Sequence, residues 1–131
     1  MTRCRDPNRR TGLLGEEHAA SHMRRLGFEL LGRNVRTRHG EIDLIAFDGE
    51  VLAFVEVKSA RCAPGRTEPT VAPLQRLDAR KRSRLRRLAG AWLNDPDVAR
   101  PWAPTIRFDA VAVLLDAGGA LLRLDHLEGA W

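Results

Sequence analysis

Three carboxylates and one lysine lie in two neighbouring apolar stretches of the chain. The stretches are GEIDLIAF at residues 40–47 and VLAFVEVK at residues 51–58, and the charged residues are Glu41, Asp43, Glu56 and Lys58. Carboxylate oxygens are the ligands that Mg²⁺ prefers in proteins, and a lysine ammonium is a compact positive charge. These residue types predict a site for a divalent cation if the chain brings them together.

The two stretches are predicted to form an antiparallel β-hairpin, which would bring the charged residues together. Asp48-Gly49 lies between them, and Asp-Gly between apolar strands is a strong hairpin signal. A two-residue loop there, counted back along both strands, places Glu41 directly opposite Glu56 and Asp43 diagonal to Glu56. Like charges directly opposite one another destabilise a sheet, so a chain that keeps them needs a compensating cation.

Alternation of side chains along the strands divides the hairpin into two faces. One face carries only apolar residues, namely Ile42, Leu44, Ala46, Val51, Ala53, Val55 and Val57. The other face is mostly apolar near the turn and charged at its open end, where Lys58 follows Glu56 on the same side. The alternative to a cation site is a solvated, polar end of the sheet, at which Lys58 neutralises one carboxylate.

Hydrophobic periodicity and turn residues predict two helices and five strands in the order α-β-β-β-α-β-β. The helices are expected over residues 12–27 and 77–94, and the strands over 28–36, 40–47, 51–58, 106–116 and 120–125. Residues 1–11 are expected to be a flexible basic tail, and the proline-rich residues 62–76 a loop. A chain of 131 residues is the size of one domain.

The first helix is predicted to direct a carboxylate toward the core. Its apolar stripe comprises Leu13, Ala19, Ala20, Met23, Leu26 and Gly27, and Glu16 falls in the middle of it. Glu16 is then either a site residue that faces inward or a first-turn residue held by the helix dipole. His18 and His22, one turn apart on the polar face, are expected to be solvated.

The second helix carries a dense positive charge. Leu77, Leu85, Leu88 and Trp92 are expected to form its buried stripe, and Arg76, Arg80, Lys81, Arg82, Arg84, Arg86 and Arg87 its basic surface. With 22 basic and 17 acidic residues, the net charge is +5. A basic face of this kind suits a phosphate backbone, and the alternative is a solvated arginine-rich surface.

Compartment and redox state are predicted from what the chain lacks. Its longest apolar run, residues 110–115, is far shorter than the roughly 20 residues of a membrane span. No apolar segment follows the basic N-terminus, so the expected location is the cytoplasm. Cys4 and Cys62 stand alone, without CxxC spacing, and are expected to be reduced thiols.

The two apolar stretches together, GEIDLIAFDGEVLAFVEVK, resemble the core motif of the PD-(D/E)XK, or restriction-endonuclease-like, nucleases. In that resemblance Asp43 is the metal-binding aspartate, residues 56–58 form the Glu-x-Lys element, and Glu16 is the inward-facing helix carboxylate.

Over residues 12–131 the chain resembles, more narrowly, the small bacterial YraN-type family. The shared elements are Gly15-Glu16, Asn34-x-Arg36, GEIDLI, FVEVK, the helix with Lys81, Arg84 and Leu85, RFD at 107–109, VAV at 111–113 and the closing residues 126–131. The chain departs after EVK, where such sequences commonly continue Thr-Arg and this one has Ser59-Ala60.

The resemblance implies an α/β fold: one restriction-endonuclease-like domain over residues 12–131, with a central mixed sheet flanked by helices. It implies a Mg²⁺- or Mn²⁺-dependent endonuclease that hydrolyses phosphodiester bonds in DNA, including branched or flapped DNA. The implied catalytic residues are Glu16, Asp43, Glu56 and Lys58. Asp43 and Glu56 are the implied metal ligands, with Glu16 and Glu41 as further candidates.

Arg36, Arg80, Lys81, Arg84 and Arg87 are expected to contact the nucleic acid, with DNA favoured over RNA. A homodimer, or a protein partner in DNA repair or uptake, is compatible with the sequence, whereas a membrane is not an expected partner. The alternative function is a non-catalytic nucleic-acid-binding or adaptor protein that retains the nuclease fold.

Overall fold

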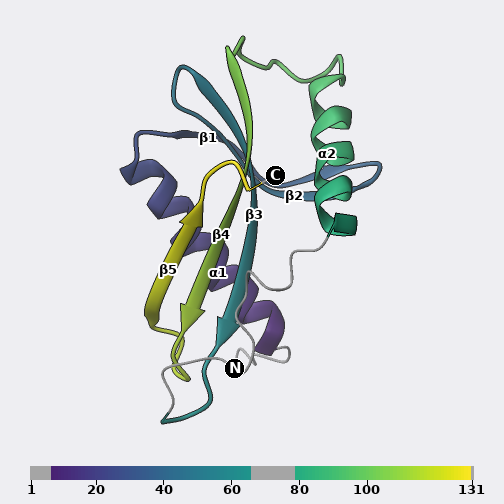
Figure 1. Cartoon of the computed structure of the whole chain (residues 1–131). Coiled ribbons are helices and arrows are strands. Elements are labelled where there is room, and N and C mark those ends of the chain that lie inside the picture. The colour runs from purple at the N-terminus through teal and green to yellow at the C-terminus, as the bar shows by residue number, and fades with distance from the viewer. Residues whose placement is uncertain (1–6, 66–78, 131) are drawn as a thin grey trace.

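A five-stranded mixed sheet with one helix on each side organises the molecule. The computed structural model describes residues 7–65 and 79–130. Its elements are α1 (Pro7–Arg25), β1 (Glu29–Thr37), β2 (Gly40–Phe47), β3 (Val51–Arg61), α2 (Ala79–Leu93), β4 (Thr105–Leu115) and β5 (Leu121–Leu127) (Figure 1). The strands lie in the order β1-β2-β3-β4-β5; β3 and β4 are parallel and the other neighbours antiparallel. The predicted α/β class and order of elements are confirmed.

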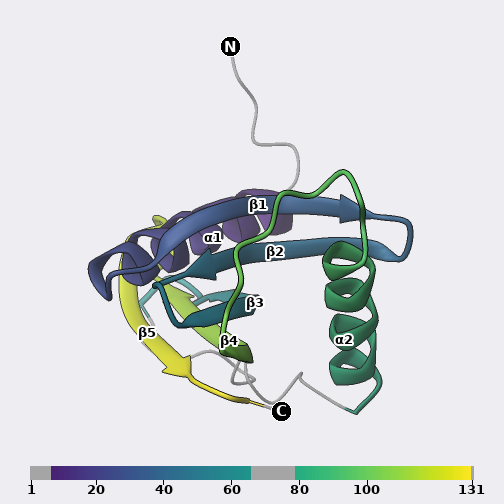
Figure 2. The same cartoon turned by 90° about the horizontal axis from the view of Figure 1, so that it is seen from above.

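Helix α1 packs against one face of the sheet (Figure 2). Ala19, Ala20 and Met23 are fully buried in a cluster with apolar residues of β2, β3 and β4. The predicted stripe was wrong at both ends, because Leu13 and Leu26 are 54% and 49% exposed.

The helix also begins earlier than expected, at Pro7. Residues 7–11, which were assigned to the tail, are therefore helical, and residues 1–6 lie outside the described residues. The buried stripe includes Thr11 and Gly15 in place of Leu13, because residues four apart share a helix face.

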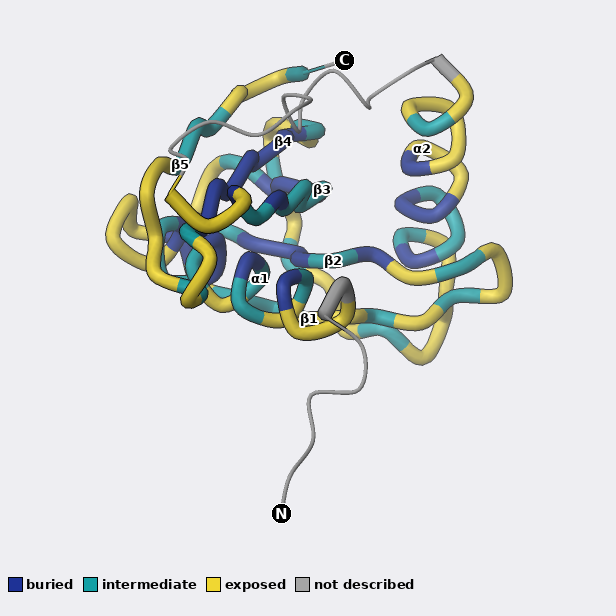
Figure 3. The backbone as a smooth tube through the Cα atoms, turned by 90° about the horizontal axis from the view of Figure 1, so that it is seen from below, coloured by how far each residue is buried: buried dark blue, intermediate teal, exposed yellow. Residues whose placement is uncertain are grey.

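Helix α2 covers the ends of β1 and β2 on the other face (Figures 1 and 2). Leu85, Leu88 and Trp92 are buried as predicted, and the Trp92 ring meets Phe54 edge to face at 5.7 Å between ring centroids. Buried residues of both helices lie on the sides turned toward the strands (Figure 3). Arg76 and Leu77 lie outside the described residues.

The β2–β3 turn is longer than the predicted two-residue loop, and this changes the register. Phe47 pairs with Leu52, so four residues lie between the paired positions. The Asp48 side chain stabilises this turn, since its Oδ1 accepts the N–H groups of Glu50 and Val51 at 2.9 and 2.7 Å. The predicted opposition of Glu41 and Glu56 was therefore wrong.

The two faces of the hairpin survive this change, because a shift of two residues keeps every side chain on its own side. Leu44, Ala46, Ala53 and Val55, which were predicted to share the apolar face, are buried together in the cluster beneath α1. Ile42 is the exception: it packs in the α2 cluster, where β2 extends beyond its pairing with β3.

Two further expectations concern the thiols and the membrane. Cys62 is buried and free, as expected, whereas Cys4 lies outside the described residues. In residues 7–65 and 79–130, neither helix has the length and apolar character needed to cross a membrane.

Candidate metal and phosphate site

Strands β2 and β3 separate at Asp43, and this fork positions the candidate site. The last pair of their ladder is Leu44 with Val55; beyond it, β3 continues beside β4 while β2 runs toward α2 (Figure 1). The N–H of Val57 thereby loses a backbone partner on β2, and Asp43 Oδ2 accepts it at 2.8 Å. Asp43 is thus held by the backbone of the neighbouring strand.

The fork opens into a hollow of about 210 Å³ between the sheet and α2, which we call the acidic hollow. Its lining consists of Glu41, Asp43, Glu56 and Lys58 from the strands and Lys81, Arg84, Leu85 and Leu88 from the helix. All three carboxylates therefore lie on the sheet side together with Lys58, and the helix side adds two further cations, Lys81 and Arg84. The structure brings together the hairpin residues and two of the basic residues that the sequence predicted separately.

Glu56 and Lys58 form an ion pair within the acidic hollow. Lys58 Nζ lies 2.9 Å from Glu56 Oε1, and the two side chains are 20% and 22% exposed. A partly buried pair is screened less by solvent than a surface pair. The arrangement orients the Lys58 ammonium toward the carboxylates.

Asp43 has the most perturbed acidity of the site. Its pKa is raised to about 7, chiefly by burial and then by the neighbouring charge of Glu56. The bond from the Val57 N–H and the charge of Lys58 act in the opposite direction, whereas Glu16 adds to the increase. A buried carboxyl beside a second carboxylate retains its proton near neutrality unless a cation compensates the charge.

Glu16 approaches this site from α1 without lining the acidic hollow. Because α1 starts at Pro7, Glu16 lies in the middle of the helix, and the first-turn alternative was wrong. Gly15 lets the helix come close: a Cβ there would overlap the Ser59 side chain on β3. This close packing brings Glu16 near enough to affect the acidity of Asp43.

The five residues that were predicted to contact nucleic acid do not all lie together. Arg36 is on β1, where it pairs with Glu41 at 3.2 Å. Lys81 and Arg84 line the acidic hollow. Arg87 lines a neighbouring, larger hollow, and Arg80 is exposed at the start of α2.

The residues present suit a hard cation that takes few ligands from the protein. In the described part of the chain, no three His, Cys, Asp or Glu side chains converge to form a metal cage. Mg²⁺ does not need such a cage, because it is usually held by one or two carboxylates, with water and substrate phosphates completing six positions. Asp43 and Glu56 are a pair of this kind, and both line the acidic hollow.

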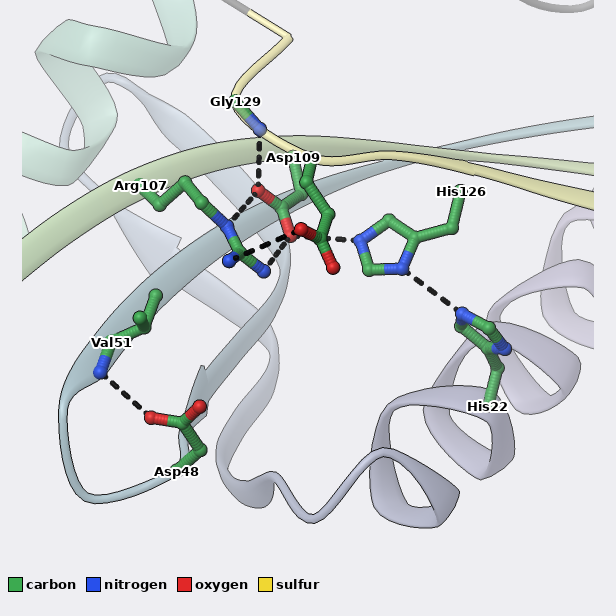
Figure 4. Close-up of polar contacts among 8 residues, drawn as sticks. His22, Asp48, Val51, Arg107, Asp109, His126 and Gly129 are labelled. Atoms are coloured by element: carbon green, nitrogen blue, oxygen red, sulfur yellow. Dashed lines mark hydrogen bonds and ion pairs between the residues drawn. The ribbon is translucent and has the colours of Figure 1, made fainter.

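A second cluster of charged residues was missed from the sequence. Asp109 on β4 is fully buried and accepts two bonds from Arg107, at 2.7 and 2.8 Å (Figure 4). Its other contacts are His126 Nε2 at 2.8 Å and the Gly129 N–H at 3.1 Å. These bonds outweigh the effect of burial and hold the pKa of Asp109 below its usual value.

His22 belongs to the same cluster, so the prediction that it is solvated was wrong. Its Nε2 lies 3.0 Å from Nδ1 of His126, and the two rings meet edge to face (Figure 4). The signal available in the sequence was Asp109, a carboxylate within the apolar run of residues 108–115. A buried carboxylate requires partners, but the sequence does not indicate which ones.

Fold and site together define a small α/β domain with a carboxylate–lysine pair at a fork in its sheet. The chain belongs to the family described as "Uncharacterised protein family UPF0102", whose model matches residues 15–113. This is the YraN-type family that the sequence motifs resemble.

Individual relatives match along most of their length. The chain is 43% identical over 120 residues to the UPF0102 protein of Nocardia farcinica, covering 92% of this chain and 87% of the relative. It is 39% identical over 127 residues to that of Pelotomaculum thermopropionicum, covering 96% and 98%. A third relative, from Herpetosiphon aurantiacus, is 36% identical over 124 residues.

Proposed function

We propose that this protein is a Mg²⁺- or Mn²⁺-dependent nuclease that hydrolyses phosphodiester bonds in DNA, with branched or flapped DNA among its substrates. The observation that carries the proposal is the acidic hollow, in which Asp43, Glu56 and Lys58 face cations of α2. Two carboxylates for a cation and several positive charges for phosphate are the components that phosphodiester hydrolysis requires.

Asp43 and Glu56 would hold the divalent ion, which when bound supplies Lewis-acid activation of a phosphate oxygen and of a water molecule. The bond from the Val57 N–H holds the Asp43 carboxylate in place before the ion arrives. Asp43 releases its proton on metal binding, since its pKa of about 7 leaves much of it protonated in the metal-free protein.

Lys58 acts on the attacking water or on the phosphate of the substrate. Its ammonium, 2.9 Å from Glu56, is placed to orient the attacking water or to stabilise charge on the phosphate oxygens. Glu16 acts from α1 through its effect on Asp43, and Glu41 lines the rim of the hollow while paired with Arg36. Lys81 and Arg84 are positioned to bind the phosphate backbone of the substrate.

The direct test is cleavage of a panel of labelled DNAs: linear duplex, single strand, flap and four-way junction. Each is incubated with Mg²⁺ or Mn²⁺ and with the wild-type protein, Glu56→Gln or Lys58→Met. We expect metal-dependent cleavage by the wild type, and a loss of about 100-fold or more in each variant. Glu50→Gln, an exposed carboxylate of the same hairpin, is the matched control and should cleave normally.

A non-catalytic nucleic-acid-binding or adaptor protein is the second candidate, and the Glu56–Lys58 ion pair favours it. In this function Lys58 neutralises Glu56 permanently, without a metal ion. Binding of DNA with no cleavage of any panel member, in either metal, would establish this candidate and overturn the nuclease proposal.

A further inference from the structure

A second hollow, of about 480 Å³, lies between the β1–β2 turn and the C-terminal half of α2. We call it the hairpin hollow. Residues 36–39, at the β1–β2 turn, line it on one side, and Arg87 and residues 90–92 of α2, with residues 94–96 after the helix, line the other. The hairpin reaches past α2 in two perpendicular views, so this hollow lies at the outer end of the sheet (Figures 1 and 2).

The hairpin side of the hollow is basic, and hydrogen bonds connect the residues of its turn. The Thr37 hydroxyl donates to the Gly40 carbonyl oxygen at 2.9 Å and accepts the His39 N–H at 3.1 Å, which fixes the turn. Arg38 Nε donates to His39 Nε2 at 3.3 Å. Arg36 is 83% exposed although it pairs with Glu41, so its guanidinium remains open to a second anion. Arg36 and Arg38 therefore line the hollow from this side, and Arg87 of α2 adds a third arginine to its lining.

The opposite side of the hollow has a different chemistry. Helix α2 ends at Leu93, and the C-terminal end of a helix carries a partial negative charge. Asn94 and Asp95 add an amide and a carboxylate, and Trp92 and Pro96 add apolar surface. A phosphate is repelled by this end of the helix, whereas a nucleobase is attracted to it, because bases carry amino donors and apolar faces.

Three arginines, together with hydrogen-bonding and apolar groups at the end of α2, match a single unpaired nucleotide. A volume of about 480 Å³ is in the range of small-molecule sites. The bases of a duplex are stacked and paired, so a duplex cannot place one there without extruding it. Unpaired bases of a single strand are free to enter pockets of this kind.

The two hollows share a boundary. Arg36 lines the hairpin hollow and its ion-pair partner Glu41 lines the acidic hollow. Arg84 of the acidic hollow lies against Gly40 of the hairpin, where a Cβ would be 2.8 Å from its guanidinium. A strand that leaves the acidic hollow along α2 therefore meets the hairpin hollow next.

We propose that the hairpin hollow binds one unpaired nucleotide of a single-stranded segment, with its phosphate toward Arg36, Arg38 and Arg87 and its base toward Trp92 and Asn94. The proposal rests on the proposed function in one respect, namely that the acidic hollow holds the neighbouring phosphodiester. It makes single-stranded DNA, or a single-stranded flap, the preferred substrate class.

The test is binding without cleavage, measured in EDTA by fluorescence anisotropy on a labelled single strand of about 20 nucleotides. Competitors are the same sequence as a duplex and an abasic strand of equal length. We expect the single strand to compete at least about tenfold better than either, since base contacts contribute only to its binding. The salt dependence of binding is recorded for each protein.

Arg38→Ala tests the phosphate side, and Arg24→Ala, an exposed arginine of α1, is its matched control. Arg38→Ala should weaken binding and lower the log–log salt slope by about 0.7, whereas Arg24→Ala should change neither. Asn94→Ala should weaken binding of the normal strand while leaving the abasic strand unaffected.

Equal competition by duplex and single strand, or equal effects of Arg38→Ala and Arg24→Ala, would overturn the proposal. Because no metal is present, the result is independent of catalysis. Selective single-strand binding without cleavage on metal addition would reject the nuclease function and retain the nucleotide site. Cleavage on metal addition, with binding unchanged in Arg38→Ala and Asn94→Ala, would retain the nuclease function and reject the nucleotide site.

Discussion

Asp43 combines a structural bond with the most perturbed acidity of the candidate site. One of its oxygens completes the hydrogen bonding of β3 at Val57, where β2 has turned away. The same carboxyl is buried beside Glu56. A single residue therefore bonds to the neighbouring strand where the two strands separate and also contributes a titratable carboxyl to the acidic hollow.

Replacing Asp43 should stabilise the metal-free protein above neutral pH. Its pKa is raised to about 7 from an unfolded value of 3.8, so ionising it in the folded state is unfavourable. This cost is fully present above pH 7 and disappears as the pH falls toward 4. Asp43→Asn keeps an oxygen for the Val57 N–H and should raise the free energy of unfolding by about 2 kcal/mol at alkaline pH.

The same variant should lose its response to metal. Mn²⁺ is expected to raise the melting temperature of the wild type, because it binds only the folded state. Melting curves with and without Mn²⁺ should show this increase in the wild type and in Glu50→Gln, but not in Asp43→Asn. A wild-type melting temperature unaffected by Mn²⁺ would contradict the assignment of Asp43 and Glu56 as ligands.

His22 should make stability depend on pH in the opposite direction. Burial lowers its pKa below 6.5, with contributions from the nearby His126 and Arg25. The unfolded chain therefore binds a proton first as the pH falls through 6.5, and stability is lost below that pH. His22→Asn should reduce this loss, as measured by urea unfolding at pH values on both sides of 6.5.

The contribution of His22 must be measured as a difference between wild type and variant, because the titration of Asp43 changes stability in the opposite direction over an overlapping pH range. The difference between wild type and His22→Asn removes the contribution of Asp43. His18→Asn, one turn earlier on α1, is the matched control and should follow the wild type. A pH dependence that is identical in all three proteins would show that His22 does not titrate between the two states.

At the scale of residues, the sequence was sufficient to predict which side chains share a face, and insufficient to predict their partners. The prediction that Asp43 and Glu56 share a face was correct, because the true register differs from the predicted one by two residues. The predicted pairing of Glu41 with Glu56 was wrong, because Asp48 stabilises a longer turn. Turn geometry of this kind depends on side-chain hydrogen bonds that a residue pattern does not specify.

Among the secondary-structure elements, α1 illustrates how one small residue sets the distance between a helix and a sheet. Gly15 lies against Ser59, and a Cβ added there would overlap the serine side chain. Gly15→Ala should therefore push α1 outward, lowering the free energy of unfolding by about 1–3 kcal/mol. It should also displace Glu16 from Asp43.

Gly12→Ala is the control for this prediction, since nothing lies within 4 Å of a Cβ at that position. This variant should be more stable than the wild type by about 0.5–1 kcal/mol, because alanine favours a helix interior. Denaturant unfolding of both variants measures the difference. Similar stabilities for the two alanine variants would mean that the close approach of α1 to β3 is unimportant.

Element order and strand positions were predictable because apolar periodicity and turn residues are local properties. GEIDLIAF matches β2 from its first residue to its last. The helix stripe was less accurate, since α1 begins five residues early and Leu13 turns outward. Where an amphipathic helix faces depends on what it packs against, which is not a local property.

At the scale of the whole molecule, Asp109 joins distant parts of the chain. It contacts Arg107 on β4, His126 on β5 and Gly129 beyond β5, and His126 contacts His22 on α1 (Figure 4). His22 and His126 are 104 residues apart in the sequence. No local pattern predicts a contact over that distance, which is why the cluster was missed.

Asp109→Asn should be strongly destabilising, because it leaves the Arg107 guanidinium without its buried partner. We expect the free energy of unfolding to fall by about 3 kcal/mol. Asp125→Asn is the control: Asp125 pairs with Arg123 at 2.7 Å, but these side chains are 45% and 70% exposed. Its effect should be at most about 1 kcal/mol. Equal losses in urea unfolding would contradict the anchoring role of Asp109.

The parallel pairing of β3 with β4 has a consequence for the order of folding events. The β1-β2-β3 meander closes through short turns, whereas β4 reaches β3 only after the long crossover through α2. Short closures cost less chain entropy and form sooner. We expect amides of the meander to gain protection from hydrogen exchange before those of β4 and β5. The separation of β2 and β3 at Asp43 would then form early in folding, before Asp109 on β4 contacts His126 on β5.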